Sequence, residues 1–163
     1  SMARYHGATQ HLFKEESPVA KVIVQSLPDY TYAQLLTAEG HAIIADEPVD
    51  EGGGGLGPSP YDLLLWALGA CTAMTLQMYA RRKKYPLDEV AVELEHERIH
   101  EKDSERSDQD GGARIERLHR RIVVRGELND AQRDDLLRVA ARCPVHKTLA
   151  STPTVVDSIE VVV

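Results

Sequence analysis

The sequence predicts an α+β fold in which antiparallel strands pack on central helices. Short segments of alternating apolar and polar residues occur near both ends of the chain and in its middle. Apolar segments with helical spacing lie between them. The resulting order is three strands, a helix, two strands, two helices and a strand, which lacks the regular strand and helix alternation of a parallel sheet.

The N-terminal third is expected to form three short strands separated by turns, at residues 20–27, 31–38 and 41–45. A glycine-rich segment follows at residues 50–57. Its backbone freedom would allow it to cradle an anion, but no Gly-Lys-Ser/Thr follows to complete a phosphate loop. We therefore interpret this segment as a mobile connector.

The first helix has a well-marked start at Pro60. Ser59 can cap the helix, Asp62 completes a capping-box pattern, and proline suits the first helical position because its missing N–H is not needed there. Residues 63–79 are apolar nearly all round, so we expect this helix to be buried on most sides. Cys71, one of only two cysteines, lies in its middle.

The rest of the chain is expected to form a hairpin of two strands (90–100 and 114–125), two helices (129–142 and 144–149) and a final strand (154–163). The hairpin tip, residues 101–112, is charged and glycine-containing, which is typical of a mobile loop. Pro144 would remove an internal helix hydrogen bond, so a new helix should begin there with Cys143 as its cap.

Length and charge limit the class of protein. The 163 residues fit one domain at 20–163, preceded by an N-terminal arm at 1–19 in which Ser1 is interpreted as a cloning scar. The net charge of −7 argues against a nucleic-acid binder, because phosphate contacts need a basic surface. No apolar run approaches the roughly 18 residues of a membrane span, and no secretory leader is visible. We expect a soluble, cytoplasmic protein.

The two cysteines are the main candidates for chemistry. A thiol acts as a nucleophile only as the thiolate, and the N–H groups at a helix start would lower the pKa of Cys143. His146, three residues later, could add a hydrogen bond or a charge. Apolar burial would instead raise the pKa of Cys71. Two alternatives stay open: inert packing of both cysteines, and a zinc site of Cys71, Cys143 and His146 that lacks an evident fourth ligand.

The cysteines also stand in motifs that resemble those of a known family. The first motif runs Gly57-Pro58-Ser59-Pro60-Tyr61-Asp62 and continues to Gly69-Ala70-Cys71-Thr72. The second is Cys143-Pro144-Val145-His146-Lys147-Thr148-Leu149. In this order and at this separation they resemble the OsmC/Ohr family of osmotically inducible and organic hydroperoxide resistance proteins, over roughly residues 20–163.

The resemblance implies an OsmC-like fold, in which antiparallel sheets wrap around two central helices in an intertwined homodimer. It also implies a thiol-dependent peroxidase, peroxiredoxin-like in activity, that defends against oxidative stress. Cys71 would attack an organic hydroperoxide and become a sulfenic acid, and Cys143 would capture it as a disulfide. A lipoyl-type or thioredoxin-like dithiol would then reduce the disulfide. We expect no cofactor, no metal, and neither a nucleic-acid nor a membrane partner.

Two residues expected from the family are missing. The position ten residues before the reactive cysteine, a glutamate in characterised peroxidases, is Tyr61 here, and the segment 30–41 has no arginine to pair with it. Tyr61 and His146 are the candidates to hydrogen-bond the thiolate or substrate in their place. The alternative function is a non-catalytic small-molecule binding protein that uses an apolar pocket at the dimer interface, with its cysteines as packing.

Overall fold

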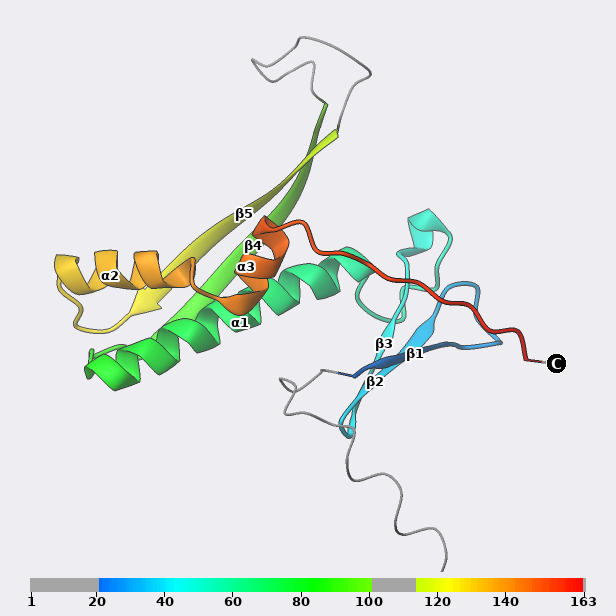
Figure 1. The fold of residues 1–163 in the computed structure, drawn as a ribbon, viewed down its shortest axis with the longest axis horizontal. Helices are drawn as coiled ribbons and strands as arrows, with labels where there is room; N and C mark the ends of the chain where they lie inside the picture. Colours follow the sequence, from blue (N-terminus) through cyan, green and yellow to red (C-terminus); the bar gives the residue numbers. More distant parts are fainter. Residues whose placement is uncertain (1–20, 101–113, 163) are drawn as a thin grey trace, which may run out of the picture. The chain divides into compact units, whose positions relative to one another are not determined.

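The protein has an α+β fold, as the sequence predicts. A computed structural model describes residues 21–100 and 114–162, which divide after Ser59 into two compact units (Figure 1). The predicted N-terminal arm, 1–19, and hairpin tip, 101–112, lie outside the described residues. The division into a single domain at 20–163 therefore stays a prediction.

The first unit is a three-stranded antiparallel sheet. Its strands, in the order β1-β2-β3, are Ile23–Ser26, Gln34–Ala38 and His41–Ala45. The turn between β2 and β3 is formed by Glu39 and Gly40, whose φ angles of 44° and 84° place both in the left-handed region. Glycine adopts this region at little cost, which explains its position in the turn. All three predicted strands are confirmed, the first two with later starts.

The glycine-rich segment is not the mobile connector that we expected. It contains a 3₁₀ turn, Val49–Glu51, and is fixed by the carboxylate of Asp46, which is only 3% exposed. This carboxylate accepts backbone N–H bonds at 2.8, 2.9 and 3.2 Å from Glu47, Gly54 and Leu56. The segment does cradle an anion, but the anion belongs to its own chain.

Two glycines of this segment are required by close packing. A Cβ atom on Gly53 would lie 1.9 Å from the backbone oxygen of Glu47, and one on Gly57 would lie 1.9 Å from that of Ile44. Any side chain at either position would force the backbone apart. The run of glycines therefore reflects a tightly folded loop and not a flexible one.

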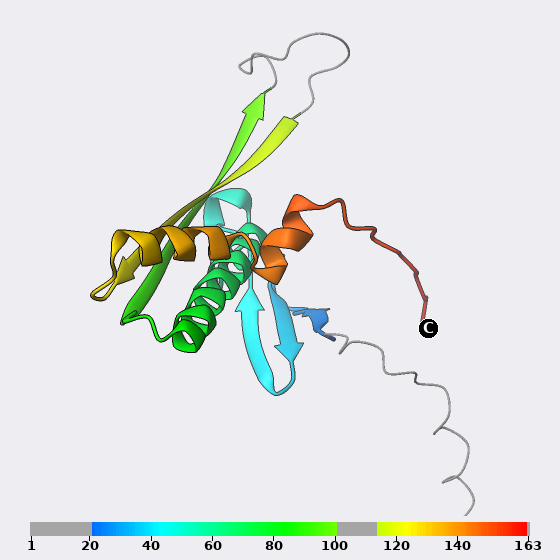
Figure 2. The same cartoon turned by 60° about the vertical axis from the view of Figure 1, so that its left-hand side comes forward.

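The second unit contains the remaining elements (Figures 1 and 2). They are α1 (Pro60–Lys83), β4 (Glu89–His100), β5 (Arg114–Arg125), α2 (Asp130–Ala140) and α3 (Pro144–Ala150). β4 and β5 form an antiparallel ribbon in which Leu94 lies opposite Arg120. α1 packs against β4, α2 and α3. Asn129 caps α2 through a capping box with Gln132, and Pro144 opens α3, both as predicted for the helix starts.

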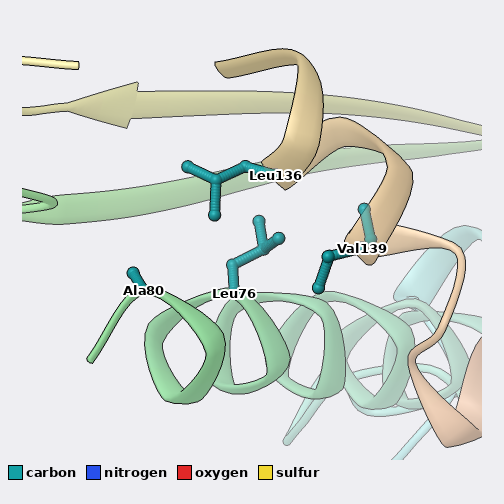
Figure 3. Close-up of a cluster of buried hydrophobic side chains, with 5 residues drawn as sticks. Leu76, Ala80, Leu136 and Val139 are labelled. Carbon is teal, nitrogen blue, oxygen red and sulfur yellow. The ribbon is translucent and has the colours of Figure 1, made fainter. Parts of the chain in front are cut away.

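A small apolar core joins α1 to α2 (Figure 3). Its buried members are Leu76 and Ala80 from α1 and Leu136, Val139 and Ala140 from α2. Beside this core, the hydroxyl groups of two tyrosines, Tyr79 and Tyr85, donate to one carboxylate oxygen of Asp135 at 2.7 and 2.9 Å. These two hydrogen bonds hold the pKa of Asp135 below its usual value. Apolar and polar contacts thus fix α2 on the C-terminal half of α1.

α1 is buried on one side only, which corrects the expectation of burial on most sides. The buried residues Leu68, Thr72, Leu76 and Ala80 recur every fourth position and so form one stripe. On other sides Trp66, Met74 and Met78 are 61%, 60% and 62% exposed. The expectation is wrong for a single chain because one copy of β4, α2 and α3 covers only one face of so apolar a helix.

α1 is also long and apolar enough to span a membrane, by length and composition alone. The sequence expectation differed because it counted uninterrupted apolar residues. The core helix of a soluble protein meets the same criterion, so this property by itself is weak support for a membrane location.

The final strand expected at 154–163 is not formed in the described part of this segment. Residues 152–162 belong to no helix or strand, and Val155, Val156 and Ile159 are 79%, 88% and 93% exposed. An extended segment becomes a strand only when its backbone N–H and C=O groups pair with a neighbour. The segment therefore has the alternating pattern of a strand, but in the described part of the chain it has no partner strand to pair with.

Candidate active site

The fold brings the two cysteines together. Cys71 lies at the middle of α1, and Cys143 immediately precedes α3. Both are free thiols, and they hydrogen-bond to each other. The predicted meeting of two thiols from distant parts of the sequence is therefore present in the structure.

The break between α2 and α3 places Cys143 at this point. Ala140 ends α2, and the N–H of Cys143 still bonds to the carbonyl oxygen of Ala140 at 3.4 Å. Cys143 then takes an extended conformation with φ −52° and ψ 127°, and Pro144 starts the next helix. Proline disfavours helical backbone in the preceding residue, so this turn follows from the Cys-Pro pair itself. The side chain of Cys143 is completely buried as a result.

Hydrogen bonds around Cys143 favour its thiolate. Burial raises the pKa of Cys143, but hydrogen bonds from the Cys71 thiol, from the backbone N–H groups of His146 and Val145, and from the Thr72 hydroxyl outweigh it. The pKa of Cys143 is therefore lowered. The sequence-based argument that a helix start would lower this pKa gives the same direction.

Cys71 has the opposite tendency. Burial raises the pKa of its thiol, and the hydrogen bond with Cys143 raises it further, while the Val145 N–H and the Thr75 hydroxyl act weakly against them. When the pair loses one proton, the remaining proton is therefore favoured on Cys71, which donates it to the sulfur of Cys143. Cys71 is the partly exposed residue of the pair, and Cys143 is the buried one.

Arg120 is a member of this site that the sequence reasoning missed. Its Nη1 donates to the Thr72 hydroxyl oxygen at 2.9 Å and to the Ala140 carbonyl oxygen at 3.4 Å. A signal was available in the strand pattern. Leu118, Arg120 and Ile122 alternate with the exposed His119 and Arg121, so the arginine shares a strand face with apolar residues.

His146 and Tyr61 are placed differently from each other. His146 contributes its backbone N–H to Cys143. Tyr61 lies ten residues before Cys71 on the same helix, a rise of about 15 Å, so the structure does not bring it to the thiols of its own chain. Its ring stacks on His96 with centroids 4.4 Å apart, and the Arg98 guanidinium lies 5.1 Å from its centre.

Glu116 completes the cluster around Tyr61. Its carboxylate accepts hydrogen bonds from His96 and, at 3.4 Å, forms an ion pair with Arg98. The hydrogen bond from His96 lowers the pKa of Glu116. The cluster attaches the first turn of α1 to β4 and β5, some distance along the helix from the thiol pair.

The open zinc alternative is not supported by the arrangement of side chains. Within residues 21–100 and 114–162, no group of three or more His, Cys, Asp or Glu residues is placed to hold a metal ion. Cys71, Cys143 and His146 therefore do not form a ready ligand set.

An apolar groove runs along α1 and β4. Its lining comes from α1 and β4: Asp62, Leu65, Trp66, Gly69, Ala70, Ala73, Val92 and Leu94. Gly69 allows the close approach of the strand, because a Cβ at this position would lie 2.9 Å from Leu94 Cδ1. Cys71 is not a lining residue: it is two positions from both Gly69 and Ala73, so at 3.6 residues per turn it lies on the opposite side of α1 from the groove.

Comparisons with known proteins agree with the fold and the thiol motifs. A family model for OsmC-like proteins matches residues 52–157, which include both cysteines. The chain belongs to the OsmC-like family. A search of curated protein sequences found no match.

Solved structures of OsmC-like proteins share this fold. The OsmC-like protein of Mycoplasma pneumoniae has a TM-score of 0.65 at 17% identity, over 83% of this chain and 89% of its own. An organic hydroperoxide resistance protein from Legionella pneumophila has a TM-score of 0.56 at 17% identity, over 83% and 91%. One from Elizabethkingia anophelis, with thiocyanate bound, has a TM-score of 0.58 at 13% identity, over 82% and 89%. The predicted OsmC-like fold of the chain is thereby confirmed, and the intertwined homodimer stays a prediction.

Proposed function

We propose that this OsmC-like protein is a thiol-dependent peroxidase that reduces organic hydroperoxides. The observation that carries the proposal is the hydrogen-bonded pair of free thiols, one partly exposed and one buried. Family membership supports a role in peroxide stress, and structural neighbours include organic hydroperoxide resistance proteins.

The reaction would begin at Cys71, because its sulfur is the accessible one. Its proton passes to Cys143, and the Cys71 thiolate attacks the outer oxygen of the hydroperoxide. The O–O bond breaks, the alkoxide leaves and takes up a proton as an alcohol, and Cys71 becomes a sulfenic acid. Two electrons have then moved from sulfur to the peroxide.

Cys143 would complete the cycle. Its thiolate attacks the Cys71 sulfur, a disulfide forms, and hydroxide leaves as water after protonation. A dithiol of lipoyl or thioredoxin-like type returns two electrons and two protons by thiol–disulfide exchange. The steps require no cofactor. A cytoplasmic location suits the reaction because that compartment keeps thiols reduced.

The preference for an organic hydroperoxide over hydrogen peroxide rests on the organic hydroperoxide resistance proteins among the structural neighbours. The apolar groove of α1 and β4 lies on the side of α1 away from Cys71, so it does not bring a hydrocarbon group to the thiols of the same chain.

A count of free thiols tests this function. Wild-type protein is mixed with one equivalent of cumene hydroperoxide or of hydrogen peroxide, and the free thiols are counted over time. We expect rapid loss of both thiols with the organic peroxide, slower loss with hydrogen peroxide, and a sulfenic acid on Cys71 in Cys143→Ser. No loss within minutes would contradict the proposal.

We also propose that the protein is a homodimer, in which the uncovered face of α1 packs on a second copy. Burying Trp66, Met74 and Met78, each about 60% exposed in one chain, would remove a large apolar area from water. Tyr61 or an arginine of the second copy would then be a candidate to approach Cys71; Tyr61 of the same chain does not reach it.

Substitution of Trp66 tests the dimer. Trp66→Glu is expected to convert the dimer to a monomer, because the interface would have to bury an unpaired carboxylate. Sedimentation equilibrium measures the mass. The matched variant Leu137→Glu changes an exposed apolar residue of α2 and should leave the dimer intact. A monomeric wild-type protein would contradict the homodimer, and a dimeric Trp66→Glu would place the interface elsewhere.

The second candidate function is non-catalytic binding of a small apolar molecule. The apolar groove favours it, as does Tyr61, which is engaged in stacking where the peroxidases carry a glutamate. On this hypothesis Cys71→Ser and Cys143→Ser would keep full ligand affinity, and peroxide would leave the thiols unchanged.

A further inference from the structure

We propose that Arg120 is the positioning residue that holds the negative charge of the Cys71 and Cys143 pair, acting through the hydroxyl group of Thr72. This inference rests on the proposed peroxidase function, for which the shared thiolate is the reactive form. It assigns the cation of the site to the middle of β5, whereas the family resemblance led us to look for an arginine in an early turn.

The strand pattern turns Arg120 toward the helices. It lies between Leu118 and Ile122 on one face of β5 and is half-buried, while its neighbours His119 and Arg121 are exposed. Arg121 binds Glu93 across the ribbon at 2.7 Å, on the outer face. Arg120 instead reaches α1 and α2, where its Nη1 donates to Thr72 and to the Ala140 carbonyl oxygen at 2.9 and 3.4 Å.

Thr72 connects the arginine to the sulfur. Its side chain is fully buried, and its hydroxyl oxygen accepts from Arg120. The single hydrogen of this hydroxyl is donated to the Leu68 carbonyl oxygen at 2.7 Å, and the Cys143 sulfur is a second acceptor, at which the hydroxyl lowers the thiol pKa. Because an N–H of Arg120 donates to the hydroxyl oxygen of Thr72, the hydroxyl hydrogen points away from Arg120 and toward these two acceptors. An anionic sulfur competes for it better than a neutral one does.

Among the described residues, no carboxylate forms an ion pair with Arg120. In the part of the chain that the structure describes, the arginines in ion pairs with Asp or Glu are Arg98, Arg117, Arg121, Arg125, Arg133 and Arg138. Arg120 donates to two neutral oxygens. A half-buried cation with neutral partners is stabilised by a nearby anion, and the shared thiolate supplies one.

Other titratable groups lie on the elements around the pair. Among them are His146 on α3, Arg142 after α2, Tyr79 on α1 and His96 on β4. Of these, His146 reaches Cys143 through its backbone N–H, which does not titrate. Arg120 is the cation with a hydrogen-bond path to the sulfur through Thr72.

The experiment is a pH titration of the thiolate by its ultraviolet absorbance, without peroxide, on the full-length reduced protein. Arg120→Met is expected to raise the midpoint of the first thiolate by about one pH unit. Arg120→Lys should keep most of the effect, because it restores the charge. Arg121→Met, on the outer face of the same strand, is the matched control and should leave the midpoint unchanged.

A second readout separates positioning from a merely structural role. For the peroxidase reaction, kcat/KM of Arg120→Met should fall about tenfold at neutral pH and recover as the pH is raised through the new midpoint. An unchanged midpoint in folded Arg120→Met would overturn the proposal. If that variant does not fold, Thr72→Val removes the connecting hydroxyl and should raise the midpoint in the same direction; no rise there would also overturn it.

The titration is independent of the proposed function. If peroxide leaves the thiols unchanged but the midpoint moves in Arg120→Met as expected, the peroxidase proposal fails and the role of Arg120 stands. If peroxide oxidises both thiols but the midpoint does not move in Arg120→Met, the peroxidase proposal stands and the role of Arg120 fails.

Discussion

Replacing Cys71 with serine is expected to reduce the consumption of organic hydroperoxide to the rate of the uncatalysed reaction. A serine hydroxyl does not form an anion at neutral pH and cannot be oxidised to a sulfenic acid, so the first step of the proposed cycle is lost. The measurement is the disappearance of cumene hydroperoxide in the presence of a dithiol reductant. Circular dichroism of the variant establishes that it remains folded.

The matching variant Cys143→Ser should behave differently. It keeps Cys71 and is expected to reduce one equivalent of hydroperoxide and then stop, because the sulfenic acid has no thiol to form a disulfide. A sulfenic acid in Cys71→Ser and none in Cys143→Ser would show that the two roles are exchanged. That outcome is meaningful here because Cys143 carries the lowered pKa. A slow rate insensitive to Cys71→Ser would remove the enzyme proposal altogether.

Replacing Leu136 with alanine is expected to destabilise the protein by about 2–5 kcal/mol. Leu136 is only 2% exposed and packs on Leu76 and Ala80 of α1, in the core that joins the two helices. The loss combines the transfer free energy of the removed carbons with the cavity that they leave. The measurement is the free energy of unfolding from urea denaturation.

The next residue along the chain provides a matched control. Leu137 is 67% exposed, on the same helix and with the same side chain. Leu137→Ala changes helix propensity as Leu136→Ala does but removes no core contact, so its effect should stay within about 0.5 kcal/mol. Equal losses in the two variants would mean that the core between α1 and α2 contributes less than its burial indicates.

Much of the fold follows from local sequence signals. Pro60 and Pro144 mark two helix starts, and Asn129 caps a third, because each residue type satisfies or removes backbone N–H groups at that point. The alternation of β4 and β5 likewise depends on short-range pattern alone. The thiol pair was predicted from the setting of each cysteine together with the family resemblance.

Features that depend on contacts between distant residues were harder to predict. The anion in the glycine-rich loop is the side chain of Asp46, which precedes the loop and has no distinctive motif. Arg120 reaches Thr72 across elements separated by a hairpin. The burial of α1 and the state of residues 152–162 depend on what covers them, which no local pattern specifies.

The two cysteines differ in burial, and this difference determines which of them an oxidant would react with first. Cys143 has no exposed surface, whereas Cys71 is partly open. In the proposed reaction, an oxidant from solvent would therefore meet Cys71 first, and the Cys143 thiolate would react only after a sulfenic acid has formed on Cys71. Irreversible over-oxidation of Cys71 would then require a second oxidant molecule to react with its sulfenic acid before the neighbouring Cys143 sulfur attacks it. Burial of Cys143 would thus protect the thiol that resolves the sulfenic acid from direct reaction with the hydroperoxide.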